Sequence, residues 1–258
     1  MICLMSDLRR IFYSFVLLVM GIFFFISGYK SFRRKRLIED TPTSKIRAIA
    51  MGLVEIYGMV VPYKGKILKS PLTNKDCVYY FFIIEEYRSS EKGGRWVTIK
   101  TGAKRVPFFL QDDTGKVLVD PEGAQVEVNR DYEFYSSTTK TPPQSIIQFM
   151  ESSGIRYKSF LGLNRSLRFR EYFIAPKDKL YILGTAGDNP YVEDGSVSQG
   201  YEDVMIQKGK KNSIYYISDK PEKDLIKNYK WRIVGGFVGG VLLILVGISG
   251  ILLGFNLF

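Results

Sequence analysis

The sequence predicts a membrane protein in which two transmembrane α-helices flank a mainly β (α+β) soluble domain. No charged residue occurs from Ile11 to Gly28 or from Ile233 to Phe258. Each run is long enough to cross a hydrocarbon core of about 30 Å as a helix. Between them, short segments rich in aromatic and β-branched residues alternate with turns. That alternation is typical of antiparallel hairpins in a small sheet or barrel.

The same pattern divides the chain into consecutive segments. They are an N-terminal tail (1–10), a first transmembrane helix (11–28), a basic juxtamembrane segment (29–42), a β-rich domain (43–217), a juxtamembrane helix (218–232) and a second transmembrane helix (233–258). A cleaved signal peptide is an alternative for the first run, because Arg9 and Arg10 precede it. The run is longer than a usual signal core and has no clear cleavage site, so a retained anchor is favoured.

Basic residues flank both apolar runs on the side of the central domain. They are Lys30, Arg33, Arg34, Lys35, Arg36, Lys220, Lys223, Lys227, Lys230 and Arg232. Cytoplasmic flanks carry an excess of lysine and arginine. We therefore expect a multi-pass protein of the cell membrane with a cytoplasmic central domain and both termini outside. Arg9 and Arg10 favour the opposite orientation but are fewer.

The formal net charge of +11 owes most of its excess to these flanks. Anionic headgroups of the lipid bilayer are therefore an expected partner. No stripe of basic and aromatic residues typical of RNA-binding proteins occurs, so no nucleic-acid partner is expected.

The second apolar run contains glycines four or seven positions apart. They are Gly235, Gly236, Gly239, Gly240, Gly247, Gly250 and Gly254. This spacing lets helix backbones approach closely. It predicts packing against the aromatic first run, and homo-oligomerisation through the same face is the alternative. A simpler explanation also stands, because glycine is generally frequent in membrane helices.

Apolar alternation and turn residues place the elements of the central domain. Strands are predicted at Gly52–Gly58, Val78–Ile84, Trp96–Lys100, Pro107–Leu110, Lys116–Val119, Ala124–Val128, Arg168–Ile174, Lys179–Leu183 and Ser213–Ile217. Val78–Ile84 is continuously apolar, which predicts a strand buried on both faces. A helix is expected at Pro143–Gly154, and a loop at Gly187–Gly200.

Helix starts are predicted at two places by capping residues. Thr43 or Ser44 is expected to cap a short helical turn at Lys45–Ala50. Ser218 and Asp219 are expected to cap a helix that continues without a break into the second apolar run.

The residue inventory predicts no catalytic, cofactor or metal site. Two cysteines and no histidine exclude catalytic triads that need histidine, histidine metal ligands and a structural zinc site. The carboxylate pairs Glu85–Glu86 and Asp112–Asp113 are adjacent in sequence, and adjacent strand residues point to opposite faces. Aspartate in a hairpin loop is also ordinary turn chemistry.

A basic strand edge is formed by three arginines, Arg165, Arg168 and Arg170. Binding of an acidic partner or a lipid phosphate is one interpretation. A solvated face, or pairing with Glu171, is favoured.

Several segments, in this order, resemble the beside-a-membrane (GIDE-type) domain of the mitochondrial membrane-anchored E3 ubiquitin ligase family. They are Asp40–Gly58, Cys77–Tyr80, Phe109–Gly115, Val119–Ala124, Tyr181–Gly184 and Tyr216–Leu225, the last followed by a membrane span. The motifs are short and their combination carries the resemblance, which covers about residues 40–258. It implies a membrane-proximal domain that senses or binds partners.

One departure from that family bears on activity. Its eukaryotic ligases carry a RING after the second span, which needs about eight cysteine and histidine zinc ligands. Two cysteines and no histidine cannot supply them. The expectation is a RING-less prokaryotic, archaeal relative that acts as a non-catalytic interaction or sensing module with an unidentified protein partner. The alternatives are a membrane-complex subunit docking through the glycine-rich second span, and a hydrolase-like enzyme with convergent carboxylates at the membrane surface.

Overall fold

The computed structural model describes residues 2–90, 93–159, 162–190, 203–209, 214–220 and 222–254. The chain forms two compact units, a helix pair (Met1–Thr41 with Pro221–Phe258) and a domain (Pro42–Lys220). Two apolar helices therefore flank a mostly β domain, and the predicted fold class is confirmed.

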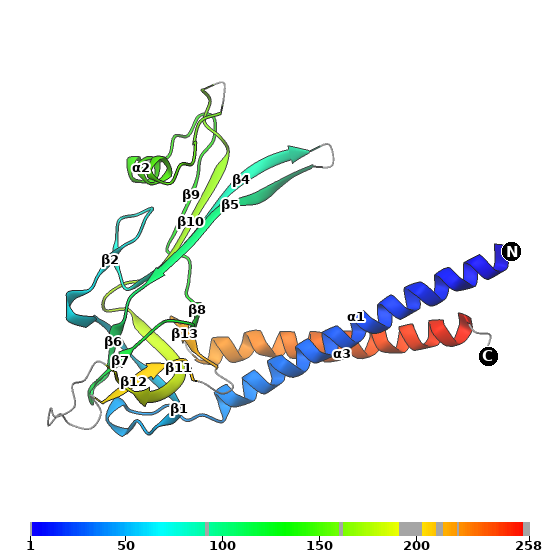
Figure 1. The fold of residues 1–258 in the computed structure, drawn as a ribbon, viewed down its shortest axis with the longest axis horizontal. Coiled ribbons are helices and arrows are strands. Elements are labelled where there is room, and N and C mark those ends of the chain that lie inside the picture. The colour runs from blue at the N-terminus through cyan, green and yellow to red at the C-terminus, as the bar shows by residue number, and fades with distance from the viewer. Residues whose placement is uncertain are drawn as a thin grey trace. The chain divides into compact units, whose positions relative to one another are not determined.

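The helix pair consists of α1 (Ile2–Glu39) and α3 (Glu222–Gly254) (Figure 1). Within them, Ile11–Arg33 and Lys230–Gly254 are long and apolar enough to cross a membrane. α3 continues without a break from the juxtamembrane segment into the apolar run, as the sequence predicts. Pro221 and residues 255–258, which the sequence assigns to this helix and span, lie outside the described residues.

Five strands of the domain close into a barrel-like ring. In order around the ring they are β1 (Gly52–Pro62), β6 (Phe108–Gln111), β7 (Lys116–Val119), β12 (Val204–Gln207) and β11 (Lys179–Asp188). The ring closes because β1 pairs with β6 along one edge and with β11 along the other. Two further strands, β13 (Tyr216–Ser218) and β8 (Gln125–Glu127), extend the sheet beyond β11.

The interior of the ring is apolar. Ile56, Leu110, Val119, Ile182 and Ile206 come from the five different strands and belong to one buried cluster. Each of these side chains is fully inaccessible to solvent. At about 25 cal/mol per Å² of apolar surface, this burial is the main stabilising contribution to the ring.

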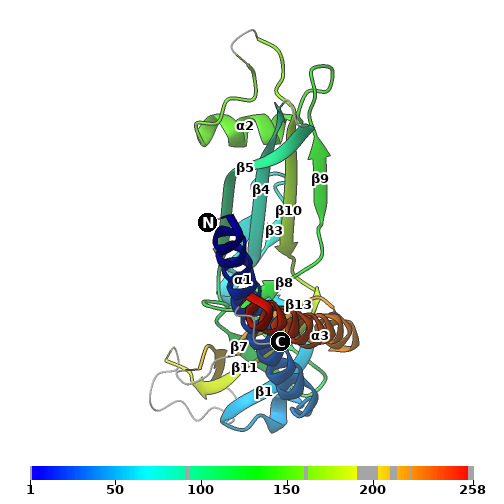
Figure 2. The same cartoon turned by 90° about the vertical axis from the view of Figure 1, so that its right-hand side faces the viewer.

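A four-stranded antiparallel sheet forms the second part of the domain (Figure 2). Its order is β5 (Gly93–Arg105), β4 (Tyr79–Ser90), β10 (Leu167–Ile174) and β9 (Tyr132–Tyr135). One face of the sheet packs against α2 (Gln144–Ser152), where Ile146 and Met150 meet Phe82, Ile84 and Phe169. A small hairpin, β2 (Leu68–Lys69) with β3 (Asp76–Cys77), completes the elements.

Most predicted elements of the domain are confirmed. The hairpins formed by β4 with β5 and by β6 with β7 occur where the sequence predicts them. No residue of Val78–Ile84 is exposed. Gly154 follows α2 with φ +69°, a left-handed conformation that glycine adopts without strain. The sequence prediction missed β9, β12 and the short hairpin of β2 and β3.

Two predictions about local structure are wrong. The loop predicted to begin at Gly187 begins later, because Gly187 and Asp188 still belong to β11 and pair with β12. Tyr191–Gly200, the rest of that loop, and Ser213 lie outside the described residues. The 3₁₀ helix η1 (Ile46–Ala48) is not capped by Thr43 or Ser44. The backbone N–H groups of Ile46 and Arg47 donate to Asp112 Oδ2 at 2.9 Å and to Thr114 Oγ1 at 3.2 Å, so side chains of the turn between β6 and β7 cap it. The hydroxyl of Thr43 instead donates to Glu55, a buried carboxylate that needs donors.

Candidate functional site

α1 and α3 meet through glycine. A Cβ at Gly236 would lie 2.6 Å from the Cα of Gly28, and one at Gly240 would lie 2.8 Å from the backbone nitrogen of Phe25. Real Cβ atoms do not approach backbone so closely, so only glycine allows this backbone-to-backbone contact. Gly21 of α1 faces the same contact, because a Cβ there would lie 2.9 Å from the carbonyl oxygen of Gly240.

The structure separates the predicted glycines into two groups. Gly247 lies against Leu18, and a Cβ at Gly250 would overlap the hydroxyl of Ser14. Gly235 and Gly239 differ from these glycines. A Cβ placed at either position would have no described atom within 4 Å, apart from atoms of neighbouring residues in α3. Gly236, Gly240, Gly247 and Gly250 therefore contact α1, and Gly235 and Gly239 do not. Gly254 ends α3.

The aromatic side chains of α1 contribute little to the contact between α1 and α3. Phe12, Phe15 and Phe23 are exposed. Phe25 packs edge-on against Phe237 with ring centroids 5.1 Å apart. The glycines therefore meet mainly the backbone of α1 rather than a layer of aromatic side chains.

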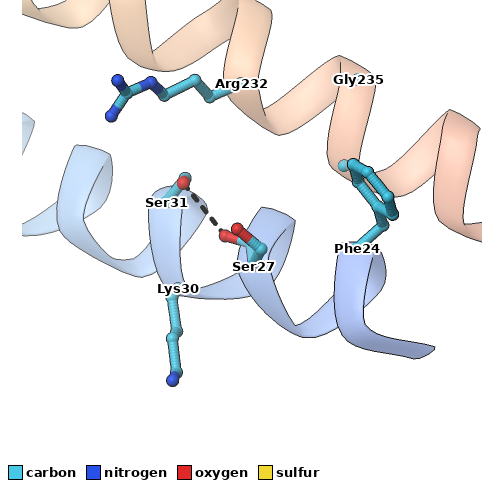
Figure 3. Close-up of a pocket in the computed structure, with 7 residues that line it drawn as sticks. Phe24, Ser27, Lys30, Ser31, Arg232 and Gly235 are labelled. Atoms are coloured by element: carbon cyan, nitrogen blue, oxygen red, sulfur yellow. Dashed lines mark hydrogen bonds between the residues drawn. The ribbon is translucent and has the colours of Figure 1, made fainter. Parts of the chain in front are cut away.

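A cleft of about 580 Å³ opens between the two helices beside this contact (Figure 3). Its lining residues are Phe24, Ser27, Lys30, Ser31, Arg232, Gly235 and Gly236. The hydroxyl of Ser31 donates to the carbonyl of Ser27 at 3.0 Å. Arg232 extends above Ser31, whereas Lys30 points away from α3. No acidic residue occurs from residue 8 to residue 38 or from residue 225 to residue 254, so the surroundings of the cleft are basic.

The other predicted flanking cations are spread over the surface of the helix pair. Lys35 forms an ion pair with Glu39 at 2.6 Å, and the guanidinium of Arg36 lies 5.5 Å from the ring centroid of Phe32. Arg33 and Lys230 are exposed. The side chains of Arg34 and Lys227 lie outside the described residues.

Arginine and glutamate side chains join β4 to β10. Arg168 Nε donates to Glu85 Oε2 at 2.6 Å, and an Arg170 Nη donates to the same oxygen at 2.7 Å. Glu85 is only 6% exposed. The hydrogen bond from Arg168 holds the pKa of Glu85 below its ordinary value, and the charge of Arg170 adds to the effect. Glu85 is therefore a stable anion that ties two strands together.

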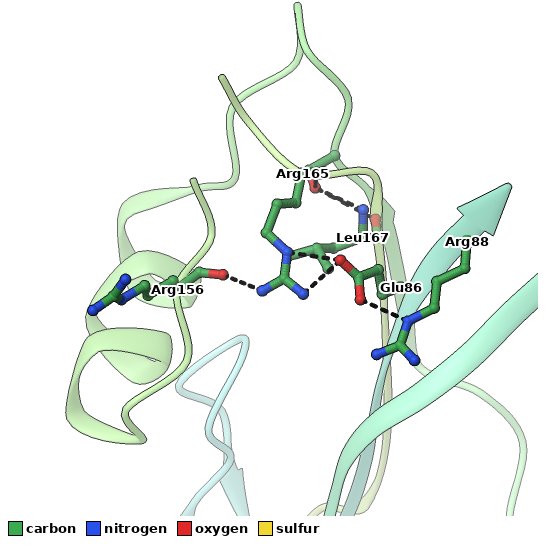
Figure 4. A network of polar contacts seen from close by, with 6 residues as sticks. Glu86, Arg88, Arg156, Arg165 and Leu167 are labelled. Carbon is green, nitrogen blue, oxygen red and sulfur yellow. Dashed lines mark hydrogen bonds and ion pairs between the residues drawn. The ribbon is translucent and has the colours of Figure 1, made fainter. Parts of the chain in front are cut away.

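The neighbouring carboxylate, Glu86, forms a second set of polar contacts (Figure 4). Arg165 Nε donates to Glu86 at 2.8 Å, and Arg88 donates to its other oxygen at 3.1 Å. Arg165 also donates to the carbonyl of Arg156 at 2.7 Å. Burial acts to raise the pKa of Glu86, but these arginines outweigh it and lower that pKa.

The predicted basic strand edge and the predicted pairing with Glu171 are therefore wrong. β10 lies between β4 and β9 and is not an edge, and Arg168 and Arg170 pair with Glu85 rather than with Glu171. The side chains of all three arginines remain partly exposed. Arg168 stands directly opposite Glu85 in the strand register. Glu171 points to the other face because side chains alternate along a strand.

Glu171 holds a loop in place. It is fully buried and accepts hydrogen bonds from the backbone N–H groups of Leu72 (2.7 Å) and Thr73 (3.2 Å). The hydroxyls of Ser70 and Thr73 also donate to it. The carboxylate therefore satisfies the donors of the turn between β2 and β3.

The two remaining carboxylates of interest are also structural. Glu55, 1% exposed, accepts a hydrogen bond from the hydroxyl of Tyr181 at 2.7 Å. Asp112 accepts from the backbone N–H groups of Thr114 and Gly115 at 2.7 and 3.0 Å, which is turn chemistry. Burial acts to raise the pKa of Asp112, but the hydrogen bond from the backbone N–H of Ile46, together with those from Thr114 and Gly115, outweighs it and lowers that pKa.

Three aspartates that are distant in sequence lie near one another, a grouping that sequence patterns do not reveal. They are Asp131, Asp178 and Asp219, and each Oδ2 accepts a backbone N–H, from Phe173, Ala175 and Asn129 respectively. Burial raises the pKa of Asp131 and of Asp178, and neighbouring negative charges add to both shifts. Within the described part of the chain, no group of three such side chains is arranged to hold a metal ion.

Cys77 is a free, fully buried thiol that donates to the carbonyl of Leu68 at 3.6 Å. Burial raises the pKa of Cys77 to about 12. The reactive thiolate is therefore scarce at neutral pH, and this cysteine is unsuited to nucleophilic chemistry.

A helix pair of membrane-crossing length and composition, attached to a closed five-stranded ring and a second sheet, defines a class of membrane-anchored β-domain proteins. The family model GIDE, described as E3 ubiquitin ligase, matches residues 83–254, from β4 to the end of α3. That range is more than half of the chain, and the chain belongs to the GIDE family. The resemblance is confirmed over this range, whereas Asp40–Gly58 and Cys77–Tyr80 precede it. No curated protein matches the chain.

Proposed function

We propose that this chain is a non-catalytic, membrane-anchored interaction module of the GIDE family. The observation that carries the proposal is that the described buried carboxylates, Glu55, Glu85 and Glu171, all hold strands or loops together. A general acid or base needs a carboxylate that faces a substrate and can exchange its proton. The two cysteines and the lack of histidine in these 258 residues cannot supply the zinc ligands of a RING, which supports a non-catalytic role for this part of the protein.

The proposal predicts partner binding without turnover. A photocrosslinker placed at Tyr135, an exposed residue of the four-stranded sheet, should capture a stoichiometric protein partner in cells. The purified full-length protein should hydrolyse neither peptides nor phospholipids. Hydrolysis that disappears in Asp131→Asn would contradict the proposal and favour the enzyme alternative, because the three aspartates are the nearest approach to convergent carboxylates.

We also propose that the basic end of the helix pair lies at the cytoplasmic leaflet of the cell membrane, with both termini outside. The positive-inside rule and the cleft with Arg232 support this orientation, since anionic lipids are concentrated in that leaflet. Trypsin added to intact cells should leave the domain whole, and trypsin added after lysis should cleave it. Cleavage on intact cells would reverse the orientation.

A membrane-complex subunit is the second candidate function. The observation that favours it is the open space at Gly235 and Gly239, which α1 leaves uncovered. These two glycines have the four-residue spacing that lets a further helix approach closely. Gly239→Leu should block such an approach, and loss of association between separate molecules in that variant would favour this candidate.

A further inference from the structure

β5 is an unusually long edge strand. It comprises 13 residues and pairs with β4 along one side. No strand in the described part of the chain pairs with its other side. β9, the opposite edge of the same sheet, has only four residues. An edge strand presents a row of backbone N–H and C=O groups to which another strand can bind, and proteins usually shorten or cover such edges.

Two features at the centre of β5 hinder the addition of another strand to this edge. The strand register shifts opposite Ile84 and Glu85, which marks a bulge at Ile99. The ammonium of Lys100 also donates a hydrogen bond to the carbonyl oxygen of Ser153 at 3.3 Å. On either side of this point the strand continues regularly, and strands of about five residues are the commonest length in proteins. The bulge therefore limits a docked strand to one half of the edge but does not close it.

All the charged residues of β5 are basic. β5 contains Arg95, Lys100, Lys104 and Arg105, and no acidic residue occurs from Gly93 to Gln111. Arg105 is engaged, because it donates to the carbonyl of Pro121 at 2.9 Å. Arg95 and Lys104 are exposed, and no described carboxylate pairs with either.

A second copy of this strand is a poor occupant of the edge. Antiparallel pairing of β5 with itself would bring basic side chains opposite or diagonal to one another, which is destabilising. An acidic strand would place carboxylates there instead.

We propose that the outer edge of β5 binds an extended, acidic segment of a partner protein as an added β-strand. The proposal rests on the function of an interaction module and names the kind of partner that the module takes. Backbone hydrogen bonds to β5 supply the binding energy, and alternate side chains supply the selectivity. Carboxylates beside Arg95 in one half of the edge, or beside Lys104 in the other half, favour acidic segments over basic ones.

The test uses the full-length protein in uncharged detergent and three synthetic octapeptides. The first alternates glutamate with valine, the second replaces each glutamate with lysine, and the third is the acidic peptide with alternate backbone nitrogens methylated. The acidic peptide should bind and slow amide hydrogen exchange within β5. The lysine and N-methylated peptides should bind at least tenfold more weakly, because one lacks the charge and the other lacks N–H donors.

Substitutions locate the binding edge. The double variant Arg95→Glu with Lys104→Glu should weaken binding of the acidic peptide at least tenfold. Arg47→Glu reverses one exposed positive charge on η1 and serves as a single-charge control, which should bind as the parent does. A parent-like affinity in the double variant would overturn the proposal.

The remaining outcomes are equally decisive. Equal binding of the N-methylated peptide would show ionic attraction without strand addition, and absence of binding would show that β5 takes no acidic strand. Concentration-dependent protection of β5 without peptide would show self-pairing, and each of these results overturns the proposal. A partner captured at Tyr135 that does not need Arg95 or Lys104 would leave the interaction function standing while removing β5 as its site.

Discussion

Leucine in place of Gly240 is expected to separate α1 from α3, whereas leucine in place of Gly239 is expected to leave the pair intact. A Cβ at Gly240 would lie 2.8 Å from backbone of α1, and one at Gly239 meets open space. Backbone cannot yield as a flexible side chain does, so the helices must move apart, at a cost of about 1–3 kcal/mol. The two substitutions are matched in chemistry and position along α3.

Disulfide formation between cysteines introduced at Ser14 and Gly250 measures this separation, because these two residues lie in contact. The yield should fall in Gly240→Leu and stay at the parent level in Gly239→Leu. Equal yields in the two variants would contradict the contact described above. Loss of association between separate molecules in Gly239→Leu alone would favour the membrane-complex alternative.

Glutamine in place of Glu85 is expected to cost about 3 kcal/mol in the free energy of unfolding of the domain at pH 7. Arg168 and Arg170 share this carboxylate and lose their common counter-charge, and a pair broken on one side leaves partly buried charge uncompensated. Fluorescence of Trp96, whose ring lies 4.7 Å from the guanidinium of Arg168, follows the transition in urea.

The cost should depend on pH. The pKa of Glu85 is lower in the folded protein than its ordinary value of 4.5. Its contribution is therefore fully present above pH 4.5 and is lost as the pH falls through the folded-state pKa. Parent and Glu85→Gln should converge in stability below pH 4.5. A constant difference down to pH 3 would contradict the assignment.

Glu133→Gln is the control for this experiment. Glu133 lies on β9 of the same sheet and pairs with Arg130 at 2.8 Å in an ion pair that is more exposed than that of Glu85. Such pairs contribute about 0–1 kcal/mol, and the variant should unfold close to the parent at every pH. A cost as large as that of Glu85→Gln would show that any lost carboxylate in this sheet has the same effect.

Local chemistry made much of the fold predictable. Turn residues located the hairpins, and the charge-free runs located α1 and α3. Closure of the ring was not predictable beyond the class of a small sheet or barrel, because it depends on β1 pairing with β11 and on β12. β12 has only four residues, too few to show a period on their own.

The side-chain partners were harder to predict than the elements. Glu171 is adjacent in sequence to Arg170, but neighbours on a strand point apart, and the carboxylate that pairs with Arg170 is 85 positions away. Glycine spacing likewise could not separate Gly239 from Gly240. Both have a partner four residues away, and only the position of α1 decides which of them is covered.

The closure of the ring also has a consequence for biosynthesis. The contact of Tyr181 with Glu55 joins residues 126 positions apart, so β1 cannot complete its pairing until β11 has left the ribosome. Such non-local closure is slow compared with helix formation. β13 pairs with β11 and is followed almost at once by α3. During translation, α1 is therefore expected to lie in the membrane without α3 until the domain is nearly complete. The synthesis of α3 follows at about the time when the ring can close.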